Sequence, residues 1–474
     1  MSDRTEQFHW RFMFLLAPGI LQAVAGILVL PLATLILTPE DYGIFGMVTG
    51  VTAAASAIVA LGSSFIIGNH FDARNKHADN VIIVSTMVWL VFLTGILISA
   101  VVAICFWVGR QYSSLISDIP YYGILFAVID IIASALWGLA TSVAVLSRMT
   151  SKHAVFASVR ALISPLVLLY VLFVLDIHGP IALFAGLGAA GVVSLVGSWS
   201  VTRPYLRICF DRLLAEKAVR MGAWLVLANF AEAIERIAER WALAFFVNVR
   251  STGLLTHSQI YPSALILGIR PAVQAAWPIL REEAIQTKPI FSKGRYLVHL
   301  IGLTFGVASL VLALIGAELI GLLTNNRFVE VAPIAAILVS VAGLRLSGCP
   351  QHAVVVANGH AGTAALVNGI SALSGIVLVL VLVPFFGLNG AIMAQVGYGL
   401  VFLGLLHMLS RRIRRTPMLD ATSLIGFVLT LVTVWGVVNL NTPVILRLVL
   451  AVLVTVAGLA LAWKIVLRSG LRIR

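Results

Sequence analysis

Charged residues interrupt an otherwise apolar stretch that runs from Met221 to Arg250. The stretch is long enough to cross a bilayer as a helix, which takes about 20 residues. Its middle carries three glutamates and two arginines, namely Glu232, Glu235, Arg236, Glu239 and Arg240. At about 100° per residue these five, with Asn229, fall within an arc of about 140°. We therefore expect them to share one face of a helix.

A charge at the centre of a bilayer costs at least about 2.5 to 3.5 kcal/mol, so this face should contact protein or water rather than lipid. The simplest interpretation is a neutralised packing stripe in which Glu232 pairs with Arg236 one turn along. The alternative is a functional site, because ionisable residues inside membrane helices commonly line substrate or ion pathways.

The composition indicates the class of protein. Of 474 residues, 60% are hydrophobic and 11% charged, far below the roughly 25% charged residues of soluble domains. We predict an all-α polytopic membrane protein. The net charge of +13 does not indicate a nucleic-acid partner, since no compact basic domain is present. Cys105, Cys209 and Cys349 show no metal or redox spacing and are expected to be free thiols.

Apolar runs bounded by turn and charge signals predict about fourteen transmembrane helices. The predicted spans are 12–37, 43–68, 81–109, 121–146, 154–175, 179–201, 222–249, 252–278, 296–323, 331–357, 363–386, 388–409, 419–439 and 443–465. The first span lacks a small-residue cleavage site and is expected to remain attached.

The distribution of lysine and arginine predicts the orientation. With the N-terminus inside, inner segments hold 23 of these residues and outer segments hold three, Arg110, Arg250 and Arg327. Positive residues concentrate in cytoplasmic loops, so both termini are expected in the cytoplasm.

A weak repeat divides the chain. Gly43 and Gly253 follow the first and seventh spans at a shift of 210, and Gly179 and Gly390 precede the sixth and twelfth at 211. A shift of six spans preserves orientation, so the repeat is parallel. We predict two pseudo-symmetric six-helix bundles around a central cavity, at residues 1–210 and 211–418. Residues 419–474 would add two helices and a basic cytoplasmic tail.

Further arginines lie inside predicted spans. They are Arg160, Arg270 and Arg345, and with Arg236 and Arg240 they give five candidate substrate-binding residues. The planar arginine fork matches phosphate oxygens two at a time and stays charged, so such a cavity suits a phosphate-bearing ligand. Alternatively, Arg160 or Arg345 pairs with a carboxylate or a helix carbonyl. Arg447 lies near a span end and is expected to snorkel to the interface.

The carboxylates predict how transport would be driven. No GxxxxGK[ST] motif occurs, so energy would come from an ion gradient rather than from a nucleotide at a P-loop. Candidate ion-coupling residues are Asp130, Glu232, Glu235 and Glu239. Glu235 and Glu239 lie one turn apart with like charge, so one of them is expected to take up and release a proton. Sodium binding is the alternative. The sequence shows no metal-site spacing, and neither a cofactor nor an enzyme activity is expected.

Three segments carry a resemblance to a known family. They are LTPEDYGIFGMVTGVTAAASAIVALG at 37–62, VNVRSTGLLTHSQIYPSALILGIRPAVQAAWPIL at 247–280 and VPFFGLNGAIMAQVGYGL at 383–400. They resemble the polysaccharide-transport and O-antigen flippase (Wzx-type) branch of the multidrug/oligosaccharidyl-lipid/polysaccharide (MOP) exporter superfamily. The charged segment AEAIERIAER at 231–240 departs from that pattern, so the site residues rest on their own chemistry.

The resemblance implies alternating access by two bundles that carry a polyprenyl-pyrophosphate-linked oligosaccharide across the membrane for O-antigen, exopolysaccharide or capsule biosynthesis. Expected partners are that glycan, the bilayer and a polymerase or export machinery. An ion-coupled multidrug or organic-cation exporter is the alternative, for which acidic groups should dominate the cavity. A third hypothesis is a membrane scaffold without transport, which the charged face at 232–240 disfavours. The sequence does not identify the glycan, the coupling ion or the oligomeric state.

Overall fold

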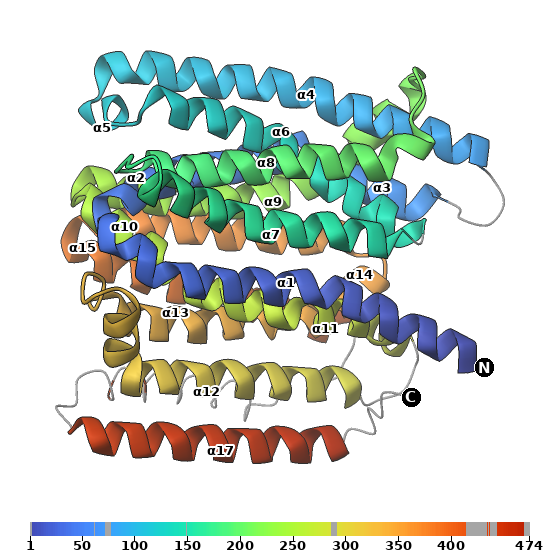
Figure 1. Cartoon of the computed structure of the whole chain (residues 1–474). Coiled ribbons are helices and arrows are strands. Elements are labelled where there is room, and N and C mark those ends of the chain that lie inside the picture. The colour runs from blue at the N-terminus through green and yellow to red at the C-terminus, as the bar shows by residue number, and fades with distance from the viewer. Residues whose placement is uncertain are drawn as a thin grey trace. The chain divides into compact units, whose positions relative to one another are not determined.

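The computed structural model describes residues 2–60, 62–71, 77–147, 149–285, 292–413, 434, 436 and 443–468, and the regular elements of this part are helices (Figure 1). Unit 1 contains α1 (Ser2–Ile36), α2 (Pro39–Val59), α3 (Ser63–His70), α4 (His77–Tyr112), α5 (Ser114–Ser117), α6 (Tyr121–Leu146), α7 (Thr150–Phe173), α8 (Ile181–Thr202), the 3-10 helix η1 (Arg203–Tyr205) and α9 (Arg212–Phe246). After α10 (Val249–Ser258) follow α11 (Ile260–Ile285), α12 (Ser292–Leu323), α13 (Val331–Leu346), α14 (Cys349–Ala357), α15 (Ala361–Ile413) and α17 (Val444–Arg468).

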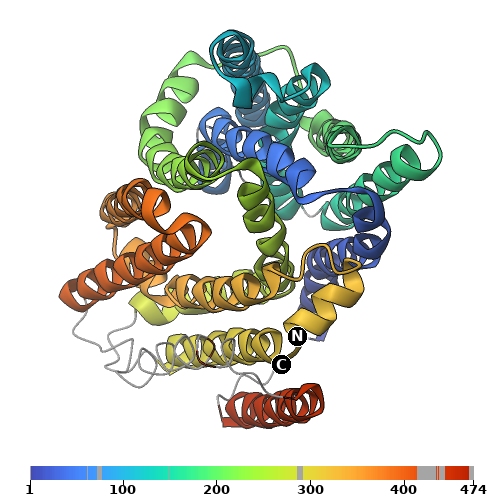
Figure 2. The same ribbon diagram turned by 90° about the vertical axis from the view of Figure 1, so that its left-hand side faces the viewer.

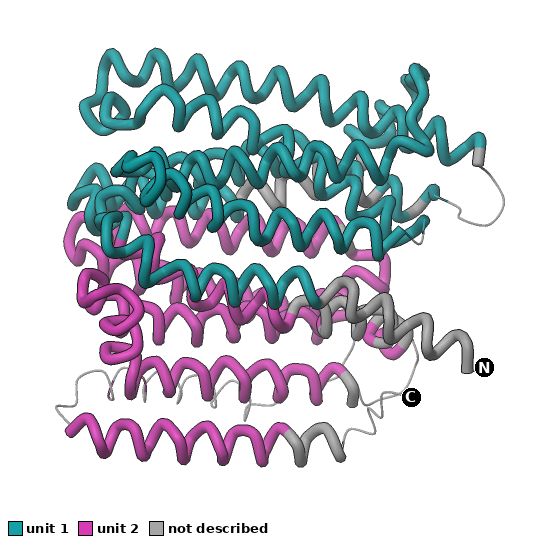
Figure 3. The backbone as a smooth tube through the Cα atoms, in the orientation of Figure 1, with its two compact units in different colours: residues 1–253 teal, residues 254–474 magenta. Residues whose placement is uncertain are grey.

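The chain forms two compact units, residues 1–253 and 254–474 (Figure 3). The packing boundary lies within α10 and not after residue 210, where the sequence repeat divides the predicted bundles. The physical reason is that α9 packs along α2 and so joins the first unit. The two six-helix bundles at 1–210 and 211–418 stay a prediction from the repeat.

The polytopic membrane fold is confirmed, but the count of fourteen spans is not. Ten helices in the described part of the chain are long and apolar enough to cross a membrane. Two predicted spans, 363–386 and 388–409, both fall in α15. The span predicted at 419–439 lies outside the described residues, and the charged helix α9 is not among the ten.

A sharp break at Gly387 divides α15 into two helices. Gly387 has φ 55° and ψ −130°, outside the helical region. A Cβ at Gly390 would lie 2.3 Å from the carbonyl oxygen of Leu382. A straight helix would hold residues eight apart about 12 Å from each other. The chain therefore folds back here, as the two predicted spans require.

Unit 1 packs through small residues on α8. A Cβ at Gly188 would lie 2.3 Å from the Phe126 ring of α6, and one at Gly197 would lie 2.7 Å from the Trp137 ring. Membrane helices gain little from apolar burial against lipid, so close approach at glycines is a common packing device. These contacts fix α6, which carries Asp130, against α8.

The start of α2 crosses the start of α10. Thr38 and Asp41 form a capping box: the Thr38 backbone N–H donates to the Asp41 carboxylate at 2.8 Å, and the Asp41 N–H donates to the Thr38 hydroxyl. One turn on, a Cβ at Gly43 would lie 2.2 Å from the Val249 carbonyl oxygen. The two helix starts that the repeat aligns are therefore in direct backbone contact.

In unit 2, α17 lies beside α12 (Figure 2). An Arg447 Nη2 atom lies 2.6 Å from a Glu318 carboxylate oxygen, and the snorkelling of Arg447 to the interface stays a prediction. An acidic residue on a neighbouring helix offers the arginine a partner within the bundle. A Cβ at Gly458 would lie 2.4 Å from Val307, so the same two helices also touch closely elsewhere.

Candidate functional site

Helix α9 carries the charged face that the sequence predicts. Asp211 caps it, since its carboxylate accepts from the Leu214 backbone N–H at 3.1 Å, and the helix continues to Phe246. The five charged residues between positions 232 and 240 therefore share one face of the helix. Glu235 and Glu239 are buried, with exposed fractions of 2% and 0%. The carboxylates of Glu235 and Glu239 thus lie inside the protein rather than in lipid.

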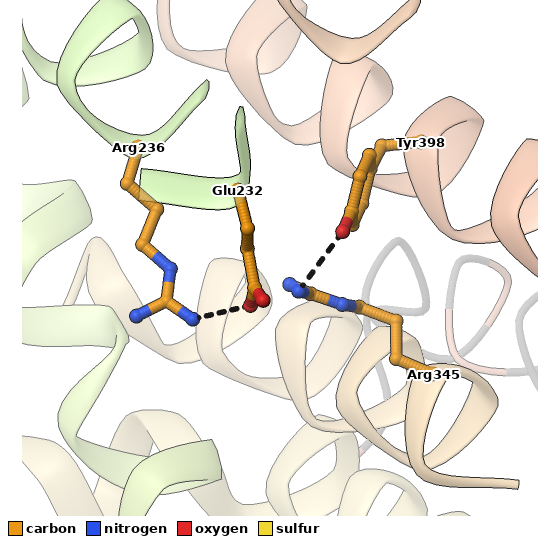
Figure 4. Close-up of polar contacts among 4 residues, drawn as sticks. All are labelled: Glu232, Arg236, Arg345 and Tyr398. Atoms are coloured by element: carbon orange, nitrogen blue, oxygen red, sulfur yellow. Dashed lines mark hydrogen bonds and ion pairs between the residues drawn. The ribbon is translucent and has the colours of Figure 1, made fainter. Parts of the chain in front are cut away.

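Glu232 and Arg236 form the predicted ion pair. The Arg236 Nη2 donates to a Glu232 carboxylate oxygen at 2.6 Å (Figure 4). The Arg236 side chain is 49% exposed and that of Glu232 33%. This is an i,i+4 pair, which stabilises a helix by about 0.3 to 0.5 kcal/mol. The pair is therefore accessible and weakly held.

Arg240 anchors α9 to α2. Its Nη1 donates to the Gly46 carbonyl oxygen at 2.9 Å, and the Thr49 hydroxyl lies 3.5 Å away. Gly50 makes room for it, since a Cβ there would lie 3.3 Å from the same nitrogen. Glu239 attracts the guanidinium charge. The sequence analysis did not name the Gly46 carbonyl as a partner of Arg240. The pattern that could have indicated it is GxxTG at residues 46–50 of α2.

A second group of charged and polar residues lies between α6 and α7. Asp130 is buried on α6 and accepts from the Ser134 hydroxyl at 3.0 Å. Arg160 of α7 attracts its charge, and the Thr52 side chain of α2 lies beside the carboxylate. The structure thus places Arg160 within electrostatic reach of Asp130.

Asp130 begins a polar stripe along α6. Residues four, seven and eleven positions on are Ser134, Trp137 and Thr141, a spacing that places them on one helix face. His153 of α7 stacks on Trp137 with ring centroids 4.5 Å apart and lies 2.9 Å from the Thr141 hydroxyl. The guanidinium of Arg160 lies 5.7 Å from the Trp137 ring centre. This spacing is the signal that sequence reasoning missed.

In unit 2, Arg345 lies over an aromatic ring. Its guanidinium carbon is 4.5 Å from the centre of the Tyr398 ring, and its Nη2 donates to the Tyr398 hydroxyl at 3.3 Å (Figure 4). Stacking on tyrosine orients the guanidinium plane. The sequence named Arg345 but not Tyr398, which lies in the VGYGL segment that carried the resemblance.

The structure groups the candidate residues into three places. Glu232, Glu235, Arg236, Glu239 and Arg240 share one face of α9, Asp130 lies with Arg160 between α6 and α7, and Arg345 lies in unit 2. The side chain of Arg270 lies outside the described residues. In each place a guanidinium lies near a carboxylate, a carbonyl oxygen or an aromatic ring.

The fold and these charged sites define a multi-pass helical membrane protein with ionisable groups held inside its helix packing. The chain belongs to the polysaccharide biosynthesis protein family, whose sequence model matches residues 32–333, well over half of the chain. The match includes the segments 37–62 and 247–280, so the resemblance found in the sequence is confirmed. Among curated protein sequences, none matches the chain significantly.

Solved structures share the fold. One is the inward-facing conformation of a multidrug resistance MATE family transporter of the MOP superfamily, with TM-score 0.65, 12% identity and coverage of 90% of this chain and 96% of that one. Another is the lipid II flippase MurJ in an inward closed conformation, with TM-score 0.64, 12% identity and coverage of 98% and 99%. A third is a MOP superfamily transporter from Pyrococcus furiosus described as having a binding pocket of reverse polarity, with TM-score 0.59, 11% identity and coverage of 91% and 96%.

Proposed function

We propose that this protein is a flippase that moves a polyprenyl-pyrophosphate-linked oligosaccharide across the bacterial inner membrane for surface polysaccharide biosynthesis. The observation that carries the proposal is membership of the polysaccharide biosynthesis protein family in a chain that shares its fold with a lipid II flippase. The five arginines in the predicted spans support an anionic substrate.

We assign the pyrophosphate to arginines in the cavity that the sequence repeat predicts. Arg236 is the first of them, because its side chain is 49% exposed and pairs with Glu232 on the helix surface. Arg345 is the second, because Tyr398 orients its guanidinium plane. Arg160 and Arg240 would attract the pyrophosphate by their charge and also have partners in the helix packing. Arg160 is attracted to Asp130, and Arg240 donates a hydrogen bond to the Gly46 carbonyl oxygen. Arg270 completes the proposed set.

We propose that an ion gradient drives transport through carboxylates. Glu235 and Glu239 are the main candidates because both are buried one turn apart, where two negative charges repel each other strongly. Asp130 and Glu232 complete the proposed set. Proton coupling is our hypothesis and sodium coupling its alternative.

The second candidate function is an ion-coupled exporter of drugs or organic cations. The observation that favours it is the set of buried carboxylates, Asp130, Glu235 and Glu239, with the MATE-like fold. Against it, each of these carboxylates has an arginine nearby on its own helix or the next one. A cation would meet those arginines as like charges.

The two functions are separated by transport in reconstituted vesicles. We expect the purified protein to move a fluorescently labelled polyprenyl-pyrophosphate glycan and not a cationic dye. Arg236→Ala and Arg345→Ala should slow the glycan, and lysine at either position should restore only part of the rate, because lysine lacks the planar fork. Arg411→Ala, at an exposed arginine near the end of α15, is the matched control. Movement of the dye without the glycan would replace the proposal by the exporter.

A further inference from the structure

The segment between α8 and α9 presents apolar and basic side chains outward. Ile208, Phe210 and Leu213 are 99%, 50% and 78% exposed. Arg203, Arg207 and Arg212 are exposed beside them, followed by exposed Lys217 and Arg220 on α9, against the acidic residues Asp211 and Glu216. Exposed apolar residues rimmed by basic ones characterise surfaces that bind membranes.

Hydrogen bonds to α4 hold this segment in place. The Ser85 hydroxyl donates to the Tyr205 carbonyl oxygen at 2.9 Å and accepts from the Arg207 N–H at 2.8 Å. The Trp89 indole N–H donates to the Arg207 carbonyl oxygen at 3.3 Å. Two fixed backbone groups at Arg207 leave Ile208 directed outward. Its exposure is therefore built into the fold.

The attachment continues on both sides of Arg207. The Asp211 N–H donates to the Thr86 hydroxyl at 3.0 Å. The Tyr205 ring meets the Phe71 ring edge-on at a centroid distance of 5.4 Å. Figure 1 shows the segment as a green loop against α4, near the end of α4 where the chain enters it. The segment is thus fixed against α4 and is not a flexible linker. Residues 203–220 are called the strap below.

The lengths of the neighbouring helices place the strap at the expected level of the lipid headgroups. The candidate span containing α8 ends at Tyr205, and that containing α4 has 35 residues, or about 52 Å of helix, which exceeds the roughly 40 to 45 Å of a whole bilayer. A hydrocarbon core of about 20 residues centred on α4 would end near Ser85, where the strap is attached. Trp89 and Tyr205 are residue types that favour this interface.

We propose that residues 203–220 form an interfacial anchor that binds anionic lipid headgroups, with Ile208, Phe210 and Leu213 inserted at the headgroup boundary. The excess of positive charge selects anionic over zwitterionic lipid, since each arginine or lysine near such a surface contributes about fivefold in affinity. The occupant is the lipid surface, because the exposed apolar residues of the strap are rimmed by an excess of basic ones and lie beside the end of the long apolar helix α4.

The insertion is tested with the full-length protein in vesicles. On a background with all three cysteines replaced, spin labels are placed at Ile208→Cys, Leu213→Cys and, as the matched exposed polar position, Glu216→Cys. The experiment measures how often each spin label collides with oxygen, which concentrates in lipid, and with a water-soluble nickel chelate. We expect labels at 208 and 213 to favour oxygen and the label at 216 to favour nickel. Equal access of nickel to all three positions would overturn the proposal.

The lipid selectivity is tested by energy transfer from a donor at Ile208→Cys to labelled phosphatidylglycerol or labelled phosphatidylcholine. We expect enrichment of phosphatidylglycerol near residue 208 and none near a donor at the exposed Leu322→Cys of α12. Arg207→Gln and Arg212→Gln should each lower the enrichment about fivefold. Enrichment that persists in the double variant, or that is equal at 322, would show that the strap does not select the lipid. Protection of residue 208 by a protein partner in place of lipid would equally overturn the assignment.

Discussion

Gly253 lies directly against the Pro39 carbonyl oxygen: a Cβ at residue 253 would lie 1.6 Å from it. The same contact occurs a second time, between Gly43 and the Val249 carbonyl oxygen. The shift of 210 that aligns Gly43 with Gly253 also aligns Pro39 with Val249, so the repeat maps one contact onto the other. The contact is reciprocal, which is the local signature of a twofold-related pair of helices.

Gly253→Ala should therefore destabilise the protein strongly. No side-chain rearrangement relieves an overlap with a backbone carbonyl, so we expect a loss at or above the upper end of the about 1 to 3 kcal/mol typical of overpacking. Gly43→Ala should behave similarly. Thermal unfolding in detergent, followed by size-exclusion chromatography, measures the effect. Gly26→Ala, where nothing lies within 4 Å of the added Cβ, is the control and should be neutral or stabilising. Equal melting of all three variants would contradict the close contact.

Arg236 and Arg240 should differ sharply when each is replaced by alanine. Arg236→Ala removes a half-exposed pair and should cost about 0.5 kcal/mol of stability while slowing glycan transport. Arg240→Ala leaves the buried Glu239 without its neighbouring cation and should cost about 3 to 5 kcal/mol. Membrane abundance and melting temperature separate the two effects. A stable, fully active Arg240→Ala variant would show that the charge on α9 is dispensable.

Glutamine at Glu235 or Glu239 tests the energy source. The substitution keeps the side-chain size and removes the titratable proton, so a proton-coupled carrier should lose the dependence of transport on an imposed pH gradient. Initial rates in vesicles with and without the gradient give the comparison, and a sodium gradient gives the alternative. Glu216→Gln, an exposed glutamate near the start of α9, is the matched control. Unchanged pH dependence in both single variants and in the double variant would exclude the pair as the coupling site.

The orientation predicted from the charge bias can be measured directly. Single cysteines at Ser251 or Asn389 should react with an impermeant maleimide added outside, and those at Lys76 or Lys293 should not. The reverse pattern would place both termini outside. Reaction at all four positions would require a different number of spans.

Much of the fold follows from the sequence because hydrophobic span length and turn glycines are local properties. The sequence predicted the two spans on either side of Gly387 and the ion pair of Glu232 with Arg236, because both features are set by residues close to each other in the chain. Long-range partners could not be predicted in this way. The carbonyl of Gly46 beneath Arg240, the Tyr398 ring beneath Arg345 and the Glu318 partner of Arg447 each depend on which helices meet. Apolar periodicity carries little information about that choice, because lipid and a neighbouring helix are similarly apolar.

The ion pair between Arg447 and Glu318 also has a consequence for biosynthesis. Glu318 enters the membrane with α12, well before α17 has been translated, and its counter-charge arrives on the last helix described. Until then the growing protein holds a carboxylate in the bilayer without the cation that neutralises it. A chain truncated before residue 444 would lack this ion pair, so we expect quality-control proteases to degrade it faster than the chain that carries Arg447.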